Sequence, residues 1–240
     1  MSKITLNAEL VVPGDHAATL HYAAEHFVNS CRDAIQDHEA FYVALSGGST
    51  PKALFSLLCT SDYVSEIEWD KVHLFWSDER SVPPTNTESN YHMAMKAGFE
   101  NMLIPRHQIH RMIAEKEIEK HAAIYENTLR KVLGDRSLDL VMLGLGEDGH
   151  TASLFPGTEA LHSKGKLVLA NYVPQKETWR MTLTFDCINA ANHIVFYVMG
   201  PTKQKMLSRV FSTPASLPCQ FAGTPENPAL WIADDEAFAP

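Results

Sequence analysis

The chain has 240 residues, of which 45% are apolar and 20% charged, a composition typical of a globular protein with enough chain to bury one sizeable core. We therefore expect a single domain over residues 1–240. The 20 Lys and Arg residues face 29 Asp and Glu residues, for a formal net charge of −9. This charge argues against a protein that tracks a nucleic-acid backbone or an anionic membrane surface. Any anion that binds must be held by a local cluster of donors.

The sequence shows no sign of export or membrane insertion. The start of the chain, residues 1–6, lacks an uninterrupted apolar run, and no apolar stretch approaches the roughly 20 residues that span a bilayer. The cysteines form no C-x-x-C pair, so neither a structural zinc site nor a disulfide framework is indicated. We expect a soluble, cytoplasmic protein with reduced thiols.

Apolar periodicity predicts helices that alternate with strands. A long amphipathic helix is expected from about Asp15, its N-cap, to His38, and further helices over residues 90–99, 117–133 and 204–211. Strands are expected over residues 41–45, 72–76, 138–143, 167–170, 179–184, 193–199 and around 230–232. The alternation favours an α/β fold with a mostly parallel sheet and helices on both faces. The Pro-rich residues 212–228 are expected to form a long surface connection.

Ligands bind at the carboxyl ends of the strands in an open parallel sheet. Polar segments that directly follow apolar strands are therefore the places to inspect, and they lie at residues 46–50, 77–80, 144–150 and 200–203. We call them the 46–50, 77–80, 144–150 and 200–203 loops.

The 46–50 loop is a glycine turn that opens a helix. Backbone N–H groups at Gly47 and Gly48, the helix dipole and the hydroxyls of Ser49 and Thr50 form a cradle suited to a phosphate. We expect Thr50 to be the N-cap and Pro51 the first helical residue. The loop is neither a Walker loop nor a G-x-G-x-x-G turn. A simple capped turn without a ligand is the alternative.

The 144–150 loop combines three glycines, two carboxylates and a histidine. We expect His150 to be a general base or acid, because imidazole transfers protons near neutral pH, and Asp148 to orient or polarise it. The alternative is that Asp148 caps a following helix and His150 only packs.

Three cations lie at or beside predicted strand ends: Arg80, Arg180 and Lys203. Each alone is compatible with solvated surface charge. Together they would offer a phosphate dianion bidentate contacts from arginine and a point charge from lysine. The sequence leaves open whether they converge. His107 and His110 lack a third ligand at a recognisable metal spacing, and Ser46 is outside a G-x-S-x-G elbow, so neither a metal site nor a serine nucleophile is expected.

In order and approximate spacing, these motifs resemble the glucosamine-6-phosphate isomerase/6-phosphogluconolactonase family, and its lactonase members most closely. The resemblance covers nearly the whole chain. It is carried by S-G-G-S-T-P at 46–51, S-D-E-R at 77–80, S-N-Y at 89–91, I-H-R at 109–111, L-G-L-G-E-D-G-H-T-A-S-L-F-P-G at 143–157, R-M-T-L-T at 180–184 and G-P-T-K at 200–203. The ending at residues 232–237 departs from the family, which puts only the last strand and helix in doubt.

The resemblance implies a Rossmann-like fold of the sugar-phosphate isomerase/deaminase type, in one 6-phosphogluconolactonase-like domain. The implied reaction is hydrolysis of 6-phospho-D-glucono-1,5-lactone to 6-phospho-D-gluconate in the oxidative pentose phosphate pathway, with no metal or organic cofactor. The family's catalytic histidine falls on His150 and its acid on Asp148. The implied phosphate contacts are Gly47, Gly48, Ser49, Thr50, Arg80, Arg180 and Lys203.

Two other functions stay open. An amino-sugar-phosphate isomerase or deaminase would use the same phosphate loop, but we would expect an Asp-Glu-Tyr motif where this chain has Asp78-Glu79-Arg80. A non-catalytic sugar-phosphate sensor would need the phosphate contacts and not His150. The expected partner is a small phosphorylated sugar lactone, with no nucleic acid and no membrane, and the protein is expected to be a monomer or small homo-oligomer.

Overall fold

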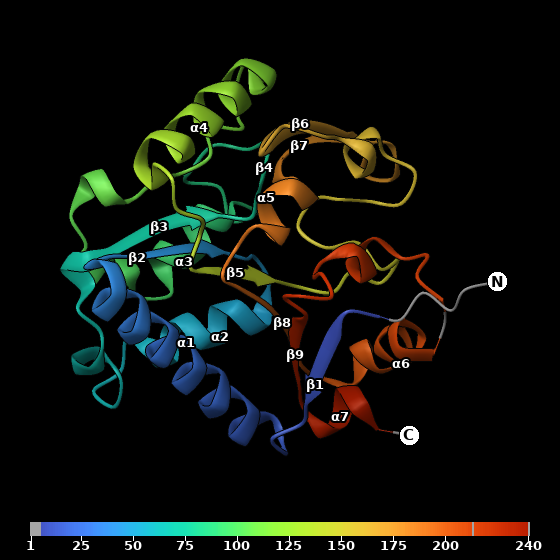
Figure 1. Cartoon of the computed structure of the whole chain (residues 1–240), viewed down its shortest axis with the longest axis horizontal. Helices are drawn as coiled ribbons and strands as arrows, with labels where there is room; N and C mark the ends of the chain where they lie inside the picture. Colours follow the sequence, from blue (N-terminus) through green and yellow to red (C-terminus); the bar gives the residue numbers. More distant parts are fainter. Residues whose placement is uncertain (1–5, 213, 240) are drawn as a thin grey trace.

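A parallel sheet forms the centre of the protein in a computed structural model that describes residues 6–212 and 214–239 (Figure 1). Within these residues the sheet has six strands, in the order β1-β9-β8-β5-β2-β3. Their bounds are Ala8–Val11, Ala229–Ala233, His193–Val198, Leu140–Leu143, Phe41–Leu45 and Val72–Trp76. All neighbouring strands are parallel, which confirms the predicted mostly parallel sheet.

A second, antiparallel sheet lies beside the first (Figure 1). In the described residues it has three strands in the order β4-β7-β6, with bounds Asp78–Arg80, Thr178–Leu183 and Val168–Val173. The expected strands at 167–170 and 179–184 therefore exist but lie outside the parallel sheet. Their connection is the single 3₁₀ turn Pro174–Lys176, and parallel neighbours need a crossover of a dozen or more residues.

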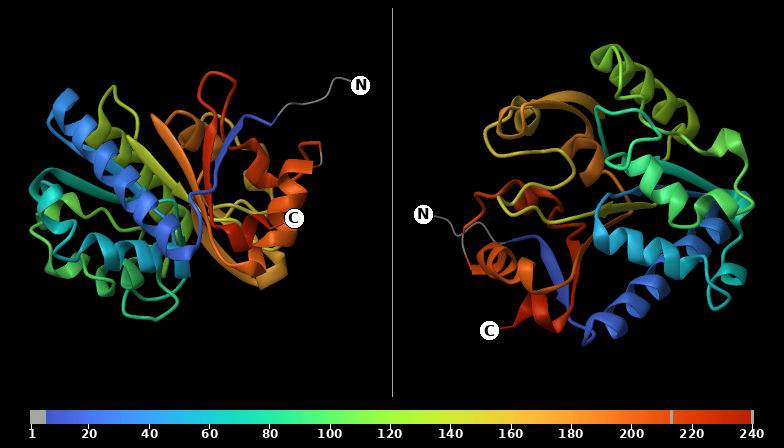
Figure 2. Two further views of the ribbon diagram at one scale, coloured as in Figure 1. Left: turned by 90° about the horizontal axis from the view of Figure 1, so that it is seen from below. Right: turned by 180° about the vertical axis from the view of Figure 1, so that it is seen from behind.

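Helices cover both sides of the parallel sheet. Helices α1 and α2 pack against each other and against β2, β8 and β9. Helix α4 lies at the opposite side, where the hydroxyl of its Tyr125 accepts the Trp76 N–H of β3 at 3.0 Å, and it also packs on β6 and β7 of the antiparallel sheet (Figures 1 and 2). The α-helices are α1 His16–His38, α2 Ser49–Leu58, α3 Asn90–Lys96, α4 Ile118–Leu133, α5 Phe185–Asn189, α6 Gln204–Ser212 and α7 Asp235–Phe238. Short 3₁₀ helices lie at Val64–Glu66, Trp69–Lys71, Phe99–Asn101, Arg106–Gln108, Glu159–His162, Pro174–Lys176, Pro201–Lys203 and Pro218–Phe221.

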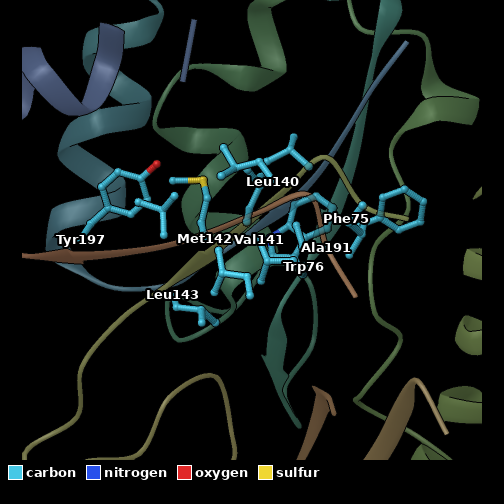
Figure 3. Close-up of a cluster of buried hydrophobic side chains, with 14 of the residues drawn as sticks. Phe75, Trp76, Leu140, Val141, Met142, Leu143, Ala191 and Tyr197 are labelled. Carbon is cyan, nitrogen blue, oxygen red and sulfur yellow. The ribbon is translucent and has the colours of Figure 1, made fainter. Parts of the chain in front are cut away.

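The core lies around β2, β5 and β8. Every residue of β5 is buried, and Figure 3 draws its side chains in one cluster with Tyr197 of the neighbouring strand β8 and with Phe75 and Trp76 of β3, which are also buried. A parallel strand with helices on both faces is buried on both faces and reads as a continuous apolar run. This is why the sequence predicts these strands well.

Most expected helices are confirmed, and two details are wrong. Helix α1 begins as predicted, with the Asp15 carboxylate accepting the Ala18 N–H at 2.9 Å. Thr50 is not the N-cap of α2: Gly48 takes that place at φ 112°, a conformation that favours glycine, so the helix begins at Ser49. The helix expected to reach residue 99 ends at Lys96, because the chain turns at Gly98 with φ 140°.

The end of the chain forms the predicted last strand and helix. The last strand and a short helix are both present, as β9 and α7, although the ending departs from the family. Residues 1–5, at the start of the chain, lie outside the described residues, and so does residue 213 of the predicted surface connection. Among the described residues, no helix is long and apolar enough to cross a membrane.

Candidate active site

The four inspected loops lie on one edge of the parallel sheet. They follow β2, β3, β5 and β8, which are adjacent in the order β8-β5-β2-β3 and point the same way. A direct contact ties the 200–203 loop to the 144–150 loop, because Lys203 Nζ donates to the Leu145 carbonyl at 2.7 Å. The 46–50 loop lies against the same loop: a Cβ placed on Gly144 would be 3.7 Å from Ser46 Oγ.

His150 is held by Asp148 and by an aromatic ring. Its Nδ1 lies 2.5 Å from Asp148 Oδ1, its backbone N–H donates to the same oxygen at 3.1 Å, and its ring stacks on Phe155 with centroids 3.8 Å apart. Among the described residues none bonds to Nε2. The side chain is 26% exposed, so Nε2 is the ring nitrogen available to a water or a substrate.

Asp148 sets the tautomer of this histidine. Burial by itself would raise the pKa of the Asp148 carboxyl, but the hydrogen bonds from the His150 ring and backbone outweigh burial and lower the pKa. An ionised carboxylate only accepts hydrogen bonds, so Nδ1 carries the proton and the neutral ring keeps a lone pair on Nε2. The alternative that Asp148 caps a helix is wrong, because the chain continues as a turn in which Leu154 N–H donates to Thr151 O at 2.9 Å.

Glycines make the room for this pair. A Cβ on Gly146 would lie 2.1 Å from His150 Nδ1, inside the imidazole ring's own space. Gly149 has φ 82°, and a Cβ there would meet Leu217 at 2.9 Å. Gly146 is therefore required by the position of the His150 ring, and Gly149 by the turn that carries it.

The 46–50 loop presents the open start of helix α2. No described side chain caps this helix, so its first N–H groups are available to an anion. Ser49 is exposed and Thr50 is buried. A Cβ on Gly47 would lie 2.0 Å from Asn90 Oδ1, which shows how closely the start of α3 approaches the loop.

Arg80 and Arg180 lie directly opposite each other on two adjacent strands of the antiparallel sheet. They are register partners in the β4–β7 ladder, although 100 positions separate them in the chain. Arg80 Nη1 donates to the Glu88 carbonyl at 2.6 Å, whereas Arg180 Nε and Nη1 are buried and find no acceptor among the described residues. Burial, and then the charge of Arg80, lower the pKa of Arg180. The oxygens of an incoming phosphate would accept hydrogen bonds from the free donors of both guanidinium groups.

Asp78 and Glu79 are buried carboxylates for which the sequence suggested no role, and they connect the 77–80 loop to neighbouring segments of the site. Asp78 accepts from Ser153 Oγ at 2.6 Å and from Asn90 Nδ2 at 3.1 Å, which joins the 77–80 loop to the segment after His150. Glu79 is bound to the start of α3. An Asp-Glu pair directly after a buried strand was the available signal. Among the described residues, Lys203 is bonded to the 144–150 loop. The strand pairing that makes Arg80 and Arg180 neighbours does not include Lys203.

The comparisons with known proteins agree with the motifs. A model of the family described as glucosamine-6-phosphate isomerases/6-phosphogluconolactonase matches residues 14–231. The chain belongs to this family. Lactonases are among its relatives: a 6-phosphogluconolactonase of Chlamydia pneumoniae is 41% identical over 221 residues, covering 90% of this chain and 84% of that protein. One of Nostoc sp. is 35% identical over 234 residues, covering 94% and 95%.

Solved structures of this family share the fold. A 6-phosphogluconolactonase from Trypanosoma cruzi superposes with a TM-score of 0.86 at 28% identity, over 99% of this chain and 98% of that one. The expected family and its α/β fold are thereby confirmed. Among the described residues, no group of three or more His, Cys, Asp or Glu side chains is placed to hold a metal ion.

Proposed function

We propose that this chain is a 6-phosphogluconolactonase, a carboxylic ester hydrolase that converts 6-phospho-D-glucono-1,5-lactone to 6-phospho-D-gluconate. Relatives of that name, 35–41% identical over most of the chain, support the assignment. The observation that carries it is the ordered pair of Asp148 and His150, with Nε2 open, on the same sheet edge as the arginine pair.

In the proposed mechanism, His150 activates water. A lactone is already an activated ester, so no covalent intermediate is required. Neutral Nε2 takes a proton from a water as its oxygen attacks the lactone carbonyl, and Asp148 stabilises the resulting imidazolium. Backbone N–H groups of the glycine loops stabilise the oxyanion. The tetrahedral intermediate collapses, the bond to the ring oxygen breaks, and the imidazolium returns the proton to that oxygen.

The phosphate fixes the lactone in place. Arg80 and Arg180 bind it with their free donors, Lys203 adds a point charge, and the first N–H groups of the 46–50 loop (Gly47, Gly48, Ser49 and Thr50) complete the cradle. Binding energy from this remote group orients the carbonyl against the water at His150. No step requires a metal or an organic cofactor.

The proposal also covers domain organisation, location, oligomeric state and partners. We infer one domain over residues 1–240, acting in the cytoplasm as a monomer or a small homo-oligomer. The name of the relatives supports a small phosphorylated lactone as the partner, and the net charge of −9 argues against nucleic acid or an anionic membrane.

The test is the hydrolysis of freshly generated lactone against its spontaneous rate in buffer containing a metal chelator. The wild type should accelerate the reaction, and His150→Ala should lower kcat by about 10² to 10⁴ while 6-phosphogluconate still binds. His193→Ala is the matched control, because His193 is exposed at the amino end of β8, on the opposite edge of the sheet. No acceleration by folded wild type would refute the assignment and favour an isomerase, deaminase or sensor.

A further inference from the structure

Glu79 is a buried carboxylate that the proposed chemistry does not use. It lies in β4 between Asp78 and Arg80 and is only 3% exposed. Four donors bind it. Oε1 accepts the N–H groups of Arg80 and Asn90, both at 2.8 Å, and Oε2 accepts the Ser89 hydroxyl at 2.8 Å and the Tyr91 N–H at 2.9 Å.

These donors come from both ends of the connection between β4 and α3. Residue 80 ends β4 and residues 89–91 begin α3, so a single carboxylate closes the segment between them. Inside the segment, the Glu88 carbonyl accepts from Arg80 Nη1 at 2.6 Å. The closure thus acts on the backbone that carries the Arg80 guanidinium and on the carbonyl that holds it.

The same closure reaches the 46–50 loop. Asn90 donates its N–H to Glu79, and its side chain occupies the space where a Cβ of Gly47 would stand, 2.0 Å from Asn90 Oδ1. The Asn90 amide also donates to the Asp78 carbonyl at 2.9 Å. The cation and the helix start that are proposed to bind one phosphate are therefore linked through Glu79.

We propose that Glu79 is a positioning residue for the phosphate end of the substrate. It fixes Arg80 and, through Asn90, the 46–50 loop at the spacing that one phosphate requires. It touches neither the phosphate nor the lactone. This inference rests on the proposed function, since it names a further residue of the same site.

Glu79→Gln tests the inference with almost no change in volume. The amide keeps one acceptor oxygen, and its NH₂ group opposes the two donors on the other side, so one pair of hydrogen bonds is lost. We expect KM for the phosphorylated lactone to rise about tenfold, equivalent to about 1.4 kcal/mol, with kcat within about threefold. For the unphosphorylated glucono-1,5-lactone, kcat/KM should not change, because that substrate has no phosphate to position.

Asp139→Asn is the matched control for simple loosening of the fold. Asp139 is also 3% exposed and accepts from Tyr42 N–H at 2.8 Å, His38 Nε2 at 3.0 Å and Asn192 Nδ2 at 3.0 Å. It lies just before β5, on the edge of the sheet away from the proposed site. We expect it to lower Tm without raising KM. A rise in KM in both variants, or in neither, overturns the positioning role.

If Glu79→Gln does not fold, Ser89→Ala decides. It removes one of the four donors to Glu79 and the N-cap of α3, and should raise KM about threefold. Asp15→Ala removes the N-cap of the remote helix α1 and should leave KM unchanged, so equal KM values in the two variants refute the inference. Failure of the proposed function is separate: the folded wild type itself would then not accelerate hydrolysis of the lactone, whether or not it binds 6-phosphogluconate in calorimetry.

Discussion

Replacing Gly146 by alanine tests whether the position of the His150 ring controls the reaction. The new Cβ would stand 2.1 Å from Nδ1, 2.2 Å from Cε1 and 2.7 Å from Cγ of that ring. Heavy atoms rest comfortably at about 3.5 Å, so the ring must move by more than about 1 Å. The ring cannot move without disturbing its 2.5 Å contact with Asp148 and its stacking on Phe155 at 3.8 Å.

A displacement of this size has a predictable kinetic cost. Misplacing a catalytic group by about 1 Å lowers the rate by about 10²-fold, or about 2.7 kcal/mol of transition-state stabilisation. The ring also loses the carboxylate that keeps its proton on Nδ1, so part of the population presents the wrong nitrogen to water. We expect KM to stay within about threefold, because the proposed phosphate contacts lie on other loops.

The assay is lactone hydrolysis by Gly146→Ala, with 6-phosphogluconate affinity measured by calorimetry on the same sample. Gly144→Ala is the control from the same loop: its Cβ would have an ordinary 3.7 Å contact with Ser46 Oγ, and its N–H is retained. It should keep kcat within about threefold of wild type. If Gly146→Ala also keeps wild-type kcat, the ring position seen here does not control catalysis and the role of His150 as base fails.

Two further predictions concern charge. Arg180→Met should raise KM about tenfold or more, because hydrogen bonds to charged groups contribute about 1.5–3 kcal/mol. The free energy of unfolding of this variant should not fall, since the substitution removes a buried guanidinium with unsatisfied donors beside Arg80. A large loss of stability in urea unfolding would contradict this. The second concerns pH: burial, and then neighbouring histidines, lower the pKa of His73 and of His110 from 6.5 to about 4. The unfolded chain therefore takes up protons first, and the stability present above pH 6.5 is lost as the pH falls toward 4. His110→Phe keeps the aromatic contact with Phe75 and should flatten the decline in unfolding free energy between pH 7 and 5; parallel declines would exclude this pair as a source.

The parts of the fold that sequence predicts are those in which local pattern and burial agree. Strand β2 is buried throughout and reads as five consecutive apolar residues, and α1 carries both its apolar face and its own N-cap. The antiparallel sheet is different: β4, Asp78–Arg80, consists of charged residues and is predicted as a loop, whereas β6 and β7 are predicted as strands with nothing in their pattern to set them apart from those of the parallel sheet. What separates them is the short turn at Pro174–Lys176 and the pairing of β7 with β4, a contact between distant segments that periodicity does not encode.

The candidate site divides in the same way. The pairing of Asp148 with His150 spans two residues and is therefore visible as a motif. The reason that residue 146 must be glycine is the volume of the imidazole ring, which only the folded loop reveals. The pairing of Arg80 with Arg180 depends on the β4–β7 register. Glu79 gives no sequence signal beyond its neighbours, since its partners are mostly backbone N–H groups.

If Arg80 and Arg180 bind the substrate phosphate as proposed, this pair accounts for the binding of an anion by an acidic chain. With a net charge of −9, long-range attraction works against an anion, so binding must come from short-range donors in a partly desolvated place. Backbone hydrogen bonds of the β4–β7 ladder fix the two Cα positions, and the free Arg180 donors make the unliganded pair unfavourable. A phosphate dianion bound there would offset the repulsion between the two guanidinium groups and accept from the free donors at the same time. In the proposed function, part of the affinity for the substrate phosphate would therefore come from relief of an unfavourable arrangement that the β4–β7 backbone pairing keeps in place without the phosphate.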